Sequence, residues 1–399
     1  MRYEYITSEQ HLRDFCQVIA SAEIIAFDTE FVSEDTYLPE LCLVQIAADG
    51  QLAIVDPLEF DDLSCFWELL AQPGKETLVH AGREEFRFCM RAIGRRPTNW
   101  FDVQLAAGLI GLEYPASYGT LVQKLLGKSL SKDETRTDWR KRPLTPRQIE
   151  YGLQDVVDLQ SIRSVIHSRL SELGRLEWVQ SELKTWQDDM EQSESGERWR
   201  RVGGLSGMNP RSLAIIRELW NWRDAEGERR NIPTRRILRD DLLIELAKRQ
   251  TADPKRMRAV RGMERGEILR HMPKIGACVE KALAMRDDEL PQTERRTSRP
   301  QLNLLGQFLS TALGSICRSA QVAPNLAGTA QDVRDLVAYR LDLGGFAPGE
   351  KPLLATGWRA EVVGQVIDHL LSGDLAIRIA DPLDHEPLVF EPCSRKPDA

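Results

Sequence analysis

The sequence lacks the features of a disulfide framework, a zinc site, a membrane span and a secretory signal. Its seven cysteines are odd in number, lie far apart and are never spaced as C-x-x-C, so neither disulfides nor zinc binding are indicated. No apolar run approaches the roughly 18 residues that cross a bilayer. The opening stretch, MRYEYITSEQ, has no apolar segment of the secretory kind. We therefore expect a cytoplasmic protein with reduced thiols and no membrane partner.

The chain also lacks an overall excess of positive charge, and its net charge of −8 by itself disfavours a nucleic-acid partner. The charge is unevenly distributed, however. Residues 1–196 hold 20 Lys/Arg and 33 Asp/Glu, residues 197–274 hold 20 and 11, and residues 275–399 hold 13 and 17. The basic middle segment favours a polyanionic partner. A solvated, arginine-rich helical surface explains the same asymmetry equally well.

With 399 residues, the chain is too long for one typical domain. Its first half alternates period-two and period-3.6 hydrophobic patterns, which predicts a mixed α/β sheet, and segments 213–285 and 302–373 are helical in pattern. Periodicity fails at 187–212 and at 287–301, where polar and charged residues dominate as in linkers. The expected regions are an α/β domain at 1–190, helical domains at 205–285 and 300–380, and a loose tail at 381–399.

Strands and helices are predicted throughout the first half. Asp49-Gly50 is typical of a two-residue hairpin turn. A later helix begins with Thr145 as N-cap, Pro146 at the first helical position and Gln148 completing a capping box. The predicted strands are Ile24–Phe27, Leu41–Ala47, Leu52–Val55 and Leu78–Ala81, and the predicted helices lie near Glu84–Arg91, Val103–Gly111 and Tyr118–Leu126.

Two acids stand one residue apart at the end of the apolar run IIAFDTEF. In a strand, Asp28 and Glu30 would project from the same face. Two carboxylates at such a short separation raise each other's pKa, and a shared hard cation such as Mg²⁺ or Mn²⁺ would relieve their repulsion. The alternative is that the strand ends near Asp28 and both acids are solvated.

Two further groups of polar residues lie on predicted helices. Tyr151 and Asp155 are four residues apart and therefore share a helix face. A hydroxyl beside a metal-bound carboxylate can hold a water molecule, although an exposed helical hydrogen bond explains the pair as well. Glu84 and Glu85 occupy the first turn of another helix, where acids offset the positive end of the helix dipole.

Taken together, four motifs resemble the ribonuclease D family of the DEDD exonuclease superfamily, in the branch with a tyrosine in its third motif. They are FDTEF (27–31), HAGREEF (80–86), FDVQLAA (101–107) and DETRTDWRKRPLTPRQIEYGLQDV (133–156). The resemblance covers most of residues 1–165. It implies a ribonuclease H-like fold, a mixed sheet flanked by helices, and 3′→5′ removal of nucleotides with two divalent metal ions, Mg²⁺ or Mn²⁺.

The resemblance also implies a role for each residue of the site. Asp28 would bridge both metal ions, Glu30 and Asp155 would hold the ion that activates water, and Tyr151 would orient that water. Two cations about 4 Å apart stabilise the entering and the leaving oxygen of an in-line displacement at phosphorus. The carboxylates would therefore act as ligands and not as nucleophiles.

One position departs from the family's pattern. The second motif usually carries Asp, and this chain has Glu85 there. The added methylene moves the carboxylate by more than an ångström unless the backbone compensates, but an acid that acts through metal-bound water tolerates extra reach. We expect Glu85 to join the metal site in an active enzyme. Acidic residues also occupy Ser33-Glu34-Asp35, where relatives tend to carry basic ones.

The helical segments resemble a second known module. Residues 213–263 are similar to the HRDC domain, a helical module that follows ribonuclease D catalytic domains, and residues 302–373 look like a more divergent copy. The first copy shows the resemblance at Trp222-Arg223, Asn231-Ile232-Pro233, Asp240 and Leu246-Ala247, and the second in SAQVAPNLAGTAQDVRDLV and LLATGWRAEVVGQ.

A group of arginines distinguishes the first helical module. Arg229, Arg230, Arg235, Arg236 and Arg239 cluster in the sequence around a predicted loop and helix start. They can contact phosphates with salt-dependent affinity. Alternatively, they pair with the acidic catalytic domain and dock the module against it.

The sequence thus predicts a metal-dependent 3′→5′ exoribonuclease. The family resemblance implies tRNA precursors with 3′ extensions as the RNA partner, and no obligate protein partner is indicated. One alternative is a catalytically silent RNA-binding or scaffolding protein that kept the fold after Glu85 replaced Asp. Another is a DNA 3′→5′ exonuclease, because only contacts to the 2′-hydroxyl distinguish RNA from DNA at such a site.

Overall fold

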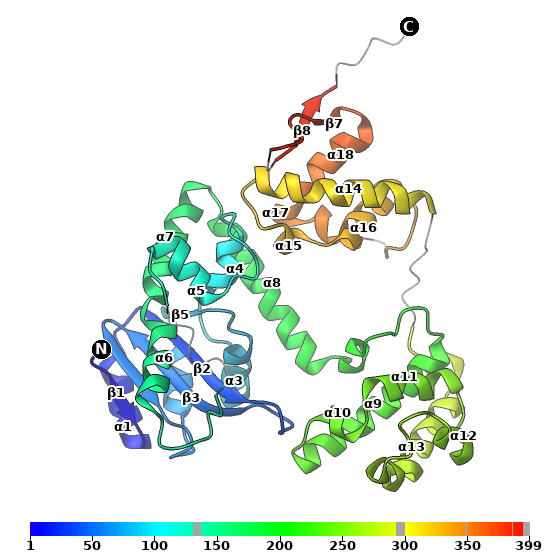
Figure 1. Ribbon diagram of the computed structural model, residues 1–399, viewed down its shortest axis with the longest axis horizontal. Helices are drawn as coiled ribbons and strands as arrows, with labels where there is room; N and C mark the ends of the chain where they lie inside the picture. Colours follow the sequence, from blue (N-terminus) through cyan, green and yellow to red (C-terminus); the bar gives the residue numbers. More distant parts are fainter. Residues whose placement is uncertain (131–136, 293–299, 348, 385, 394–399) are drawn as a thin grey trace.

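A six-stranded mixed sheet organises the N-terminal half of the chain (Figure 1). The computed structural model describes residues 1–130, 137–292, 300–347, 349–384 and 386–393. The strand order is β1-β4-β3-β2-β5-β6, in which β3 runs antiparallel to β2 and β4 and the other neighbours are parallel. The strands are β1 (Glu4–Ile6), β2 (Ile24–Val32), β3 (Glu40–Ala48), β4 (Gln51–Val55), β5 (Glu76–Val79) and β6 (Trp100–Asp102).

Helices cover both faces of the sheet. On one face the ring of Phe27 packs edge-on against Phe66 and Trp67 of helix α2, with centroid distances of 5.6 and 5.9 Å. On the other face Leu153 of helix α6 packs against Leu43 and Ile54. The helices of this half are α1 (Glu9–Val18), α2 (Ser64–Leu70), α3 (Arg83–Ile93), α4 (Val103–Gly108), α5 (Tyr118–Leu121), η1 (Val122–Leu126), α6 (Pro146–Val157), α7 (Leu159–Glu172) and α8 (Leu176–Ser195).

Local sequence signals predict several of these elements correctly. Asp49 and Gly50 both have positive φ, 46° and 76°, as the predicted hairpin turn requires. The capping box at the start of α6 is also confirmed: the Thr145 side chain accepts from the Gln148 backbone, and the Gln148 side chain accepts from the Thr145 backbone. The alternative that the first strand ends near Asp28 is wrong, because β2 stays paired with β3 as far as Val32.

Other boundaries differ from the sequence prediction. The three-residue strands β1 and β6 were not predicted, because such short segments carry no readable period. The proposed linker at 187–212 is wrong over its first part, since α8 continues to Ser195. Leu183, Trp186 and Met190 pack at helical spacing along α8, and Trp186 stacks on Trp100 at 6.2 Å. This apolar stripe holds the polar C-terminal part of the helix in place.

The next helical region has its own hydrophobic core. Residues from Trp199 to Ala282, among them Leu219 and Ile275, form a buried cluster separate from that of the sheet. The last helical region instead shares one continuous cluster with the sheet and its helices. The elements of the middle region are η2 (Arg198–Arg201), α9 (Pro210–Arg230), α10 (Thr234–Ile237), α11 (Asp240–Arg249), α12 (Pro254–Arg258), α13 (Gly266–Ala284) and η3 (Asp287–Glu289). Those of the last helical region are α14 (Pro300–Ser319), α15 (Pro324–Ala327), α16 (Ala330–Arg340), η4 (Leu353–Ala355), α17 (Gly357–Arg359), η5 (Ala360–Gly364) and α18 (Gln365–Ser372).

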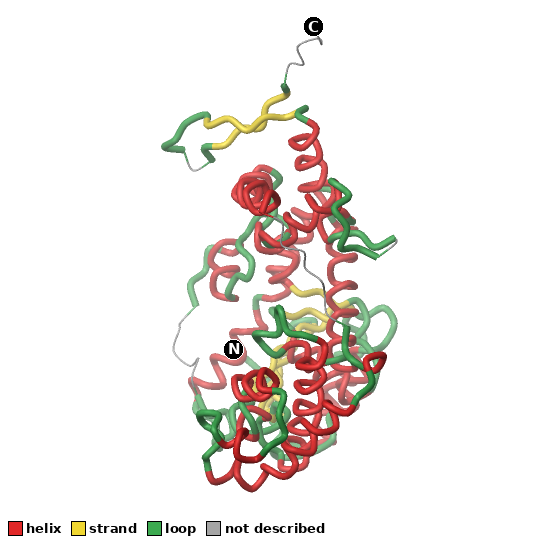
Figure 2. Tube along the Cα trace, turned by 90° about the vertical axis from the view of Figure 1, so that its right-hand side faces the viewer, coloured by secondary structure: helices red, strands yellow, loops and turns green. Residues whose placement is uncertain are grey.

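A two-stranded antiparallel hairpin follows the last helix (Figure 2). It pairs β7 (Leu375–Ile379) with β8 (Leu388–Pro392), so the expectation of a loose tail from residue 381 is wrong for the segment that forms β8. Residues 394–399 of that tail, residues 293–299 of the predicted linker at 287–301, and the start of the motif at 133–156 lie outside the described residues, whereas the last two linker residues belong to α14. Among the described helices, none combines the length and apolar character of a membrane span.

Candidate active site

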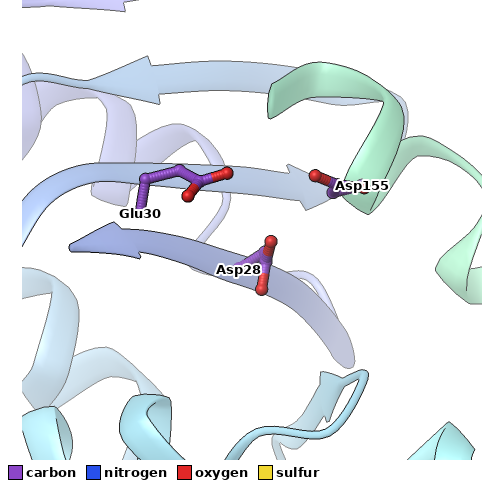
Figure 3. Close-up of side chains that lie close together, drawn as sticks. All are labelled: Asp28, Glu30 and Asp155. Carbon is purple, nitrogen blue, oxygen red and sulfur yellow. The ribbon is translucent and has the colours of Figure 1, made fainter. Parts of the chain in front are cut away.

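Three carboxylates from two distant segments of the chain converge on one point (Figure 3). Asp28 and Glu30 extend from β2, and Asp155 extends from α6. One oxygen atom of each side chain lies within 4.8 Å of an oxygen of the other two. The structure therefore brings together three of the residues that the sequence predicts as metal ligands.

Local geometry explains how each acid reaches this point. Asp28 and Glu30 are two residues apart in a continuous strand, so they project from the same face. The register between β2 and β3 shifts between Glu30 and Phe31, because Glu30 pairs with Leu43 and Phe31 with Leu41, which leaves an extra residue on β3 beside the second acid. Helix α6 starts at the capped Thr145 and lies on the same face of the sheet, which brings Asp155 over the two acids.

The site is a poor environment for three negative charges. Burial is the main cause that raises the pKa of all three carboxyls, and Asp155 adds a repulsive contribution at Asp28. The pKa of Glu30 rises to about 9 and that of Asp155 to about 7. Over the described part of the chain, no lysine or arginine lowers these pKa values. A group of partly buried carboxylate oxygens of this kind fits a hard divalent cation such as Mg²⁺ or Mn²⁺.

Tyr151 precedes Asp155 by one helical turn, as the sequence predicts. Its ring is half-buried and packs against the ring of Trp139, with centroids 6.2 Å apart. Burial, followed by the charges of Asp155, Glu30 and Asp28, raises the pKa of its phenol above the ordinary value. The Tyr151 hydroxyl therefore stays protonated at neutral pH and can take part in hydrogen bonds, but it cannot serve as a base.

A buried ion pair holds the segment that carries Trp139. Arg142 binds both carboxylate oxygens of the fully buried Asp56, with Nη2 at 2.6 Å from Oδ1. It also donates to the backbone oxygens of Trp139 at 2.7 Å and Cys42 at 2.8 Å. The Tyr5 hydroxyl donates to the same carboxylate at 2.6 Å. This network ties the turn before α6 to strands β3 and β4 and so supports the ring next to Tyr151.

Glu85 lies outside the three-acid group in the described structure. It accepts a hydrogen bond from the hydroxyl of Thr29, whose side chain projects from β2 on the face opposite to Asp28. Burial first, and then the charge of Asp28, raises the pKa of Glu85 to about 8. Glu85 is therefore a near neighbour of the cluster, and the longer side chain reaches a hydroxyl that the sequence did not suggest as its partner.

The turn before α3 determines where Glu85 stands. Asp102 accepts hydrogen bonds from the backbone nitrogens of Ala81 and Gly82, both at 3.0 Å. Gly82 has no room for a side chain, because a Cβ atom there would lie 2.5 Å from Val79 Cγ2 and 2.7 Å from Trp100 Cζ2. The motifs HAGREEF and FDVQLAA thus meet to fix the first turn of the helix that carries Glu85.

The arginines of the middle region contact mostly their own module. Arg229 pairs with Glu226 at 2.5 Å and Arg230 pairs with Glu267 at 2.6 Å. Arg235 is exposed and makes no ion pair with any residue that the structure describes. Arg229 and Arg230 are thus paired within their own module.

Arg236, in contrast, reaches the catalytic domain, in line with the docking alternative. Arg236 donates to the backbone oxygen of Glu34 at 3.1 Å, and the backbone nitrogen of Tyr37 donates to Asn231 Oδ1 at 3.2 Å. The loop between β2 and β3, which carries the acidic residues noted in the sequence, therefore touches the loop after α9.

Four residues that support the site were missed in the sequence. They are Thr29, Asp56, Trp139 and Arg142. Trp139 and Arg142 lie inside the segment 133–156 that carries the family resemblance, so a signal for them was present. Thr29 and Asp56 stand in or next to strands and had no local signal, since their partners are 56 and 86 residues away.

The fold and the site together define a 3′→5′ exonuclease followed by a helical module. A family model for a 3′-5′ exonuclease matches residues 3–171, and one for the HRDC domain matches residues 212–279. The chain is 31% identical over 380 residues to ribonuclease D of Granulibacter bethesdensis, with 94% of each chain covered. It is 33% identical over 380 residues to ribonuclease D of Acidiphilium cryptum, covering 93% of this chain and 94% of that one. The chain therefore belongs to the ribonuclease D family of 3′→5′ exoribonucleases, as the sequence motifs predict.

Solved structures agree with this assignment. The crystal structure of Escherichia coli RNase D, described as an exoribonuclease involved in structured RNA processing, superposes with a TM-score of 0.80 at 26% identity, covering 94% of this chain and 99% of that chain. The catalytic core of RRP6 from Trypanosoma brucei has a TM-score of 0.52 at 20% identity, covering 71% and 80%, and shows the shared fold. The family is one of divalent-metal-dependent exonucleases, which agrees with the carboxylate cluster.

Proposed function

We propose that Asp28, Glu30 and Asp155 hold two divalent metal ions, Mg²⁺ or Mn²⁺, for the hydrolysis of the terminal phosphodiester of RNA. The observation that supports this proposal is the convergence of three partly buried carboxylates, with ligand atoms within 4.8 Å of one another. A pair of such ions, when bound, stabilises the charge on the entering and leaving oxygens at phosphorus. The carboxylates would serve as ligands of these ions.

Tyr151 orients the attacking water in this proposal. Its hydroxyl belongs to the same helix face as Asp155 and remains protonated, so it positions the water by hydrogen bonding and does not remove its proton. Glu85, which lies near enough for the charge of Asp28 to raise its pKa, would complete the site through water-mediated contact.

The RNA substrate is a precursor with a 3′ extension, such as a tRNA precursor. Membership of the ribonuclease D family supports this, together with the structured-RNA role stated for the E. coli relative. Exposed basic residues of the HRDC region provide contacts to phosphates of a structured substrate. They include Arg235, Arg256, Arg258, Arg261 and Arg265, none of which has an ion pair within the described ranges.

We also propose a domain layout in which 1–190 is the exonuclease domain, 205–285 the HRDC domain and 300–380 a divergent HRDC-like domain. The separate buried cluster of the middle region supports the first boundary. Helices α14 to α18 support a helical third unit. Its core is continuous with that of the exonuclease domain, which makes it a docked unit.

A degradation assay tests the catalytic proposal. The full chain is incubated with 3′-extended RNA, or with DNA of the same sequence, in Mg²⁺ or Mn²⁺, and the release of mononucleotides is followed. Metal-dependent release from RNA supports the proposal. RNA binding without release in either metal would favour the catalytically silent scaffold, and equal release from DNA would remove the specificity for RNA.

A matched pair of variants tests the RNA-binding surface. Arg235→Ala removes an exposed arginine that has no ion pair with any described residue, whereas Arg229→Ala removes one that is already neutralised by Glu226. We expect Arg235→Ala to reduce the salt dependence of RNA binding by about one unit of slope, and Arg229→Ala to change it less. Equal effects of the two variants would contradict the assignment.

A further inference from the structure

Gln45 is a fully buried polar side chain whose amide is unsatisfied in the described structure. It lies on β3 with no exposed surface, and neither its Nε2 nor its Oε1 atom has a hydrogen-bond partner. Leaving both ends of an amide without partners costs free energy, and buried polar groups in folded proteins are nearly always bonded. An apolar residue would fill this position at lower cost, so the amide calls for an explanation.

The position of Gln45 connects it to the acid cluster. Gln45 is the cross-strand partner of Asp28 in the β2–β3 ladder, so the two side chains project from the same face of the sheet. Opposed side chains of this kind have Cβ atoms about 5 Å apart, which is within the reach of a glutamine amide.

Helix α6 lies against the other side of the Gln45 amide. A Cβ atom on Gly152 would lie 2.9 Å from Gln45 Nε2 and 3.2 Å from Gln45 Cγ. A methyl group at this position would therefore require the Gln45 side chain to shift. Gly152 is one turn before Asp155 and adjacent to Tyr151, so the contact sets the height of this turn of α6 above the sheet.

We propose that Gln45 is a positioning residue for the metal-binding carboxylates. Its side chain acts as a spacer between β3 and Gly152, and its amide donates a hydrogen bond to the Asp28 carboxylate once that carboxylate holds a cation. The partner that the amide lacks is thus provided by the loaded site. This inference rests on the proposed function, because it requires a cation between Asp28 and Asp155.

The first test removes the amide and keeps the shape. Gln45→Met in the full chain retains the length of the side chain without hydrogen bonds. Mn²⁺ affinity is measured by electron paramagnetic resonance of the free ion, together with the melting temperature of the metal-free protein. We expect the dissociation constant for Mn²⁺ to rise about tenfold or more, as is usual for groups that orient metal ligands. The melting temperature should stay level or rise, because an unsatisfied buried amide is removed.

Thr77→Val is the matched control. Thr77 on β5 is also fully buried, and its hydroxyl also has no partner among the residues that the structure describes, but it is not paired with a residue of the acid cluster. Thr77→Val should leave the Mn²⁺ affinity unchanged. Gln45→Met with a dissociation constant within twofold of wild type would overturn the proposal. Failure of the wild-type protein to bind Mn²⁺ would overturn the proposed function itself, and Gln45 would lose its role with it.

The second test addresses the spacer and does not depend on the fate of Gln45→Met. Gly152→Ala should weaken Mn²⁺ binding in the wild-type background, because the new Cβ strikes Gln45. In a Gln45→Ala background there is room for that Cβ, and Gly152→Ala should there cause no further loss of affinity or of melting temperature. Equal losses in both backgrounds would show that Gly152 acts independently of Gln45 and would overturn the spacer.

Discussion

The hydroxyl of Thr29 donates a hydrogen bond to Glu85 across 56 positions of the sequence. The bond lies on the side of β2 opposite to the three-acid group and gives a buried carboxyl a hydrogen-bond partner. The glutamate that departs from the family's second motif is thus anchored to the strand that carries Asp28 and Glu30.

This relationship predicts the outcome of exchanging Glu85. Glu85→Gln keeps an oxygen that can accept from Thr29 and should leave the free energy of unfolding nearly unchanged. In Glu85→Asp the side chain is too short to reach the hydroxyl, so the substitution should lower the free energy of unfolding by about 1 kcal/mol. Urea unfolding measures both values. Thr29→Val should add little to Glu85→Asp, because the same hydrogen bond is already lost, so strictly additive costs would contradict the contact.

Removal of one carboxylate from the cluster should abolish hydrolysis without harming the fold. Asp28→Asn and Asp155→Asn each lose a metal-ligand charge, and we expect kcat to fall by at least about a hundredfold. The melting temperature of the metal-free protein should rise, because repulsion between buried acids is relieved. Asp61→Asn, on an exposed acid away from the site, is the control. Retained activity in either site variant would contradict the two-metal proposal.

Metal binding should couple to pH through the raised pKa values. The pKa of Glu30 is about 9 and that of Asp155 about 7, above their ordinary values of 4.5 and 3.8. The folded protein therefore holds protons that the unfolded chain releases. The associated stability is fully present below about pH 4 and is lost as pH rises through 7 and 9 in the metal-free protein.

Divalent cations compete with those protons, so stabilisation by Mg²⁺ should grow from pH 6 to pH 9. Melting temperatures with and without Mg²⁺ across this range test the expectation. At a cation concentration one hundred times the dissociation constant, the gain is about 2.7 kcal/mol. Glu30→Gln should flatten the dependence. A Mg²⁺ effect that shrinks as pH rises would show that these carboxyls do not bind the cation.

Arg142 should matter for both stability and catalysis. Arg142→Met leaves Asp56 charged and fully buried without its cation, which we expect to cost about 3 kcal/mol of unfolding free energy. The substitution also frees the backbone of Trp139 beside Tyr151, so kcat should fall more than KM changes. Denaturant unfolding and steady-state kinetics measure the two effects. Arg140→Met, which breaks an exposed pair with Asp35, should have little effect on either.

The last helical region, α14 to α18, should unfold together with the exonuclease domain. Glu182 on α8 accepts from Arg359 at 2.6 and 2.7 Å and from Trp358 Nε1 at 3.0 Å, in a mostly buried contact. Glu182→Ala should lower the stability of this joint unit by about 3 kcal/mol. In calorimetry the substitution should shift one transition and leave that of the HRDC region, which has its own core, in place. A shift in both transitions would contradict the separation of the cores.

Sequence periodicity alone determined the local arrangement of the site. Strand alternation placed Asp28 and Glu30 on one face of β2, and helical spacing placed Tyr151 and Asp155 on one face of α6. The N-cap Thr145 fixed where α6 begins. Each of these relations depends on neighbours a few residues away, so it can be read directly from the order of the residues.

Tertiary structure decided how the local pieces meet. The convergence of strand and helix acids, the choice of Thr29 by Glu85, and the contact of Gln45 with Gly152 join residues that are far apart in the chain. The short strands β1 and β6 exist because partner strands are available to them, and the last helical unit is placed by burial against α8. Such contacts follow from packing and desolvation over the whole fold, and no short stretch of sequence contains both partners.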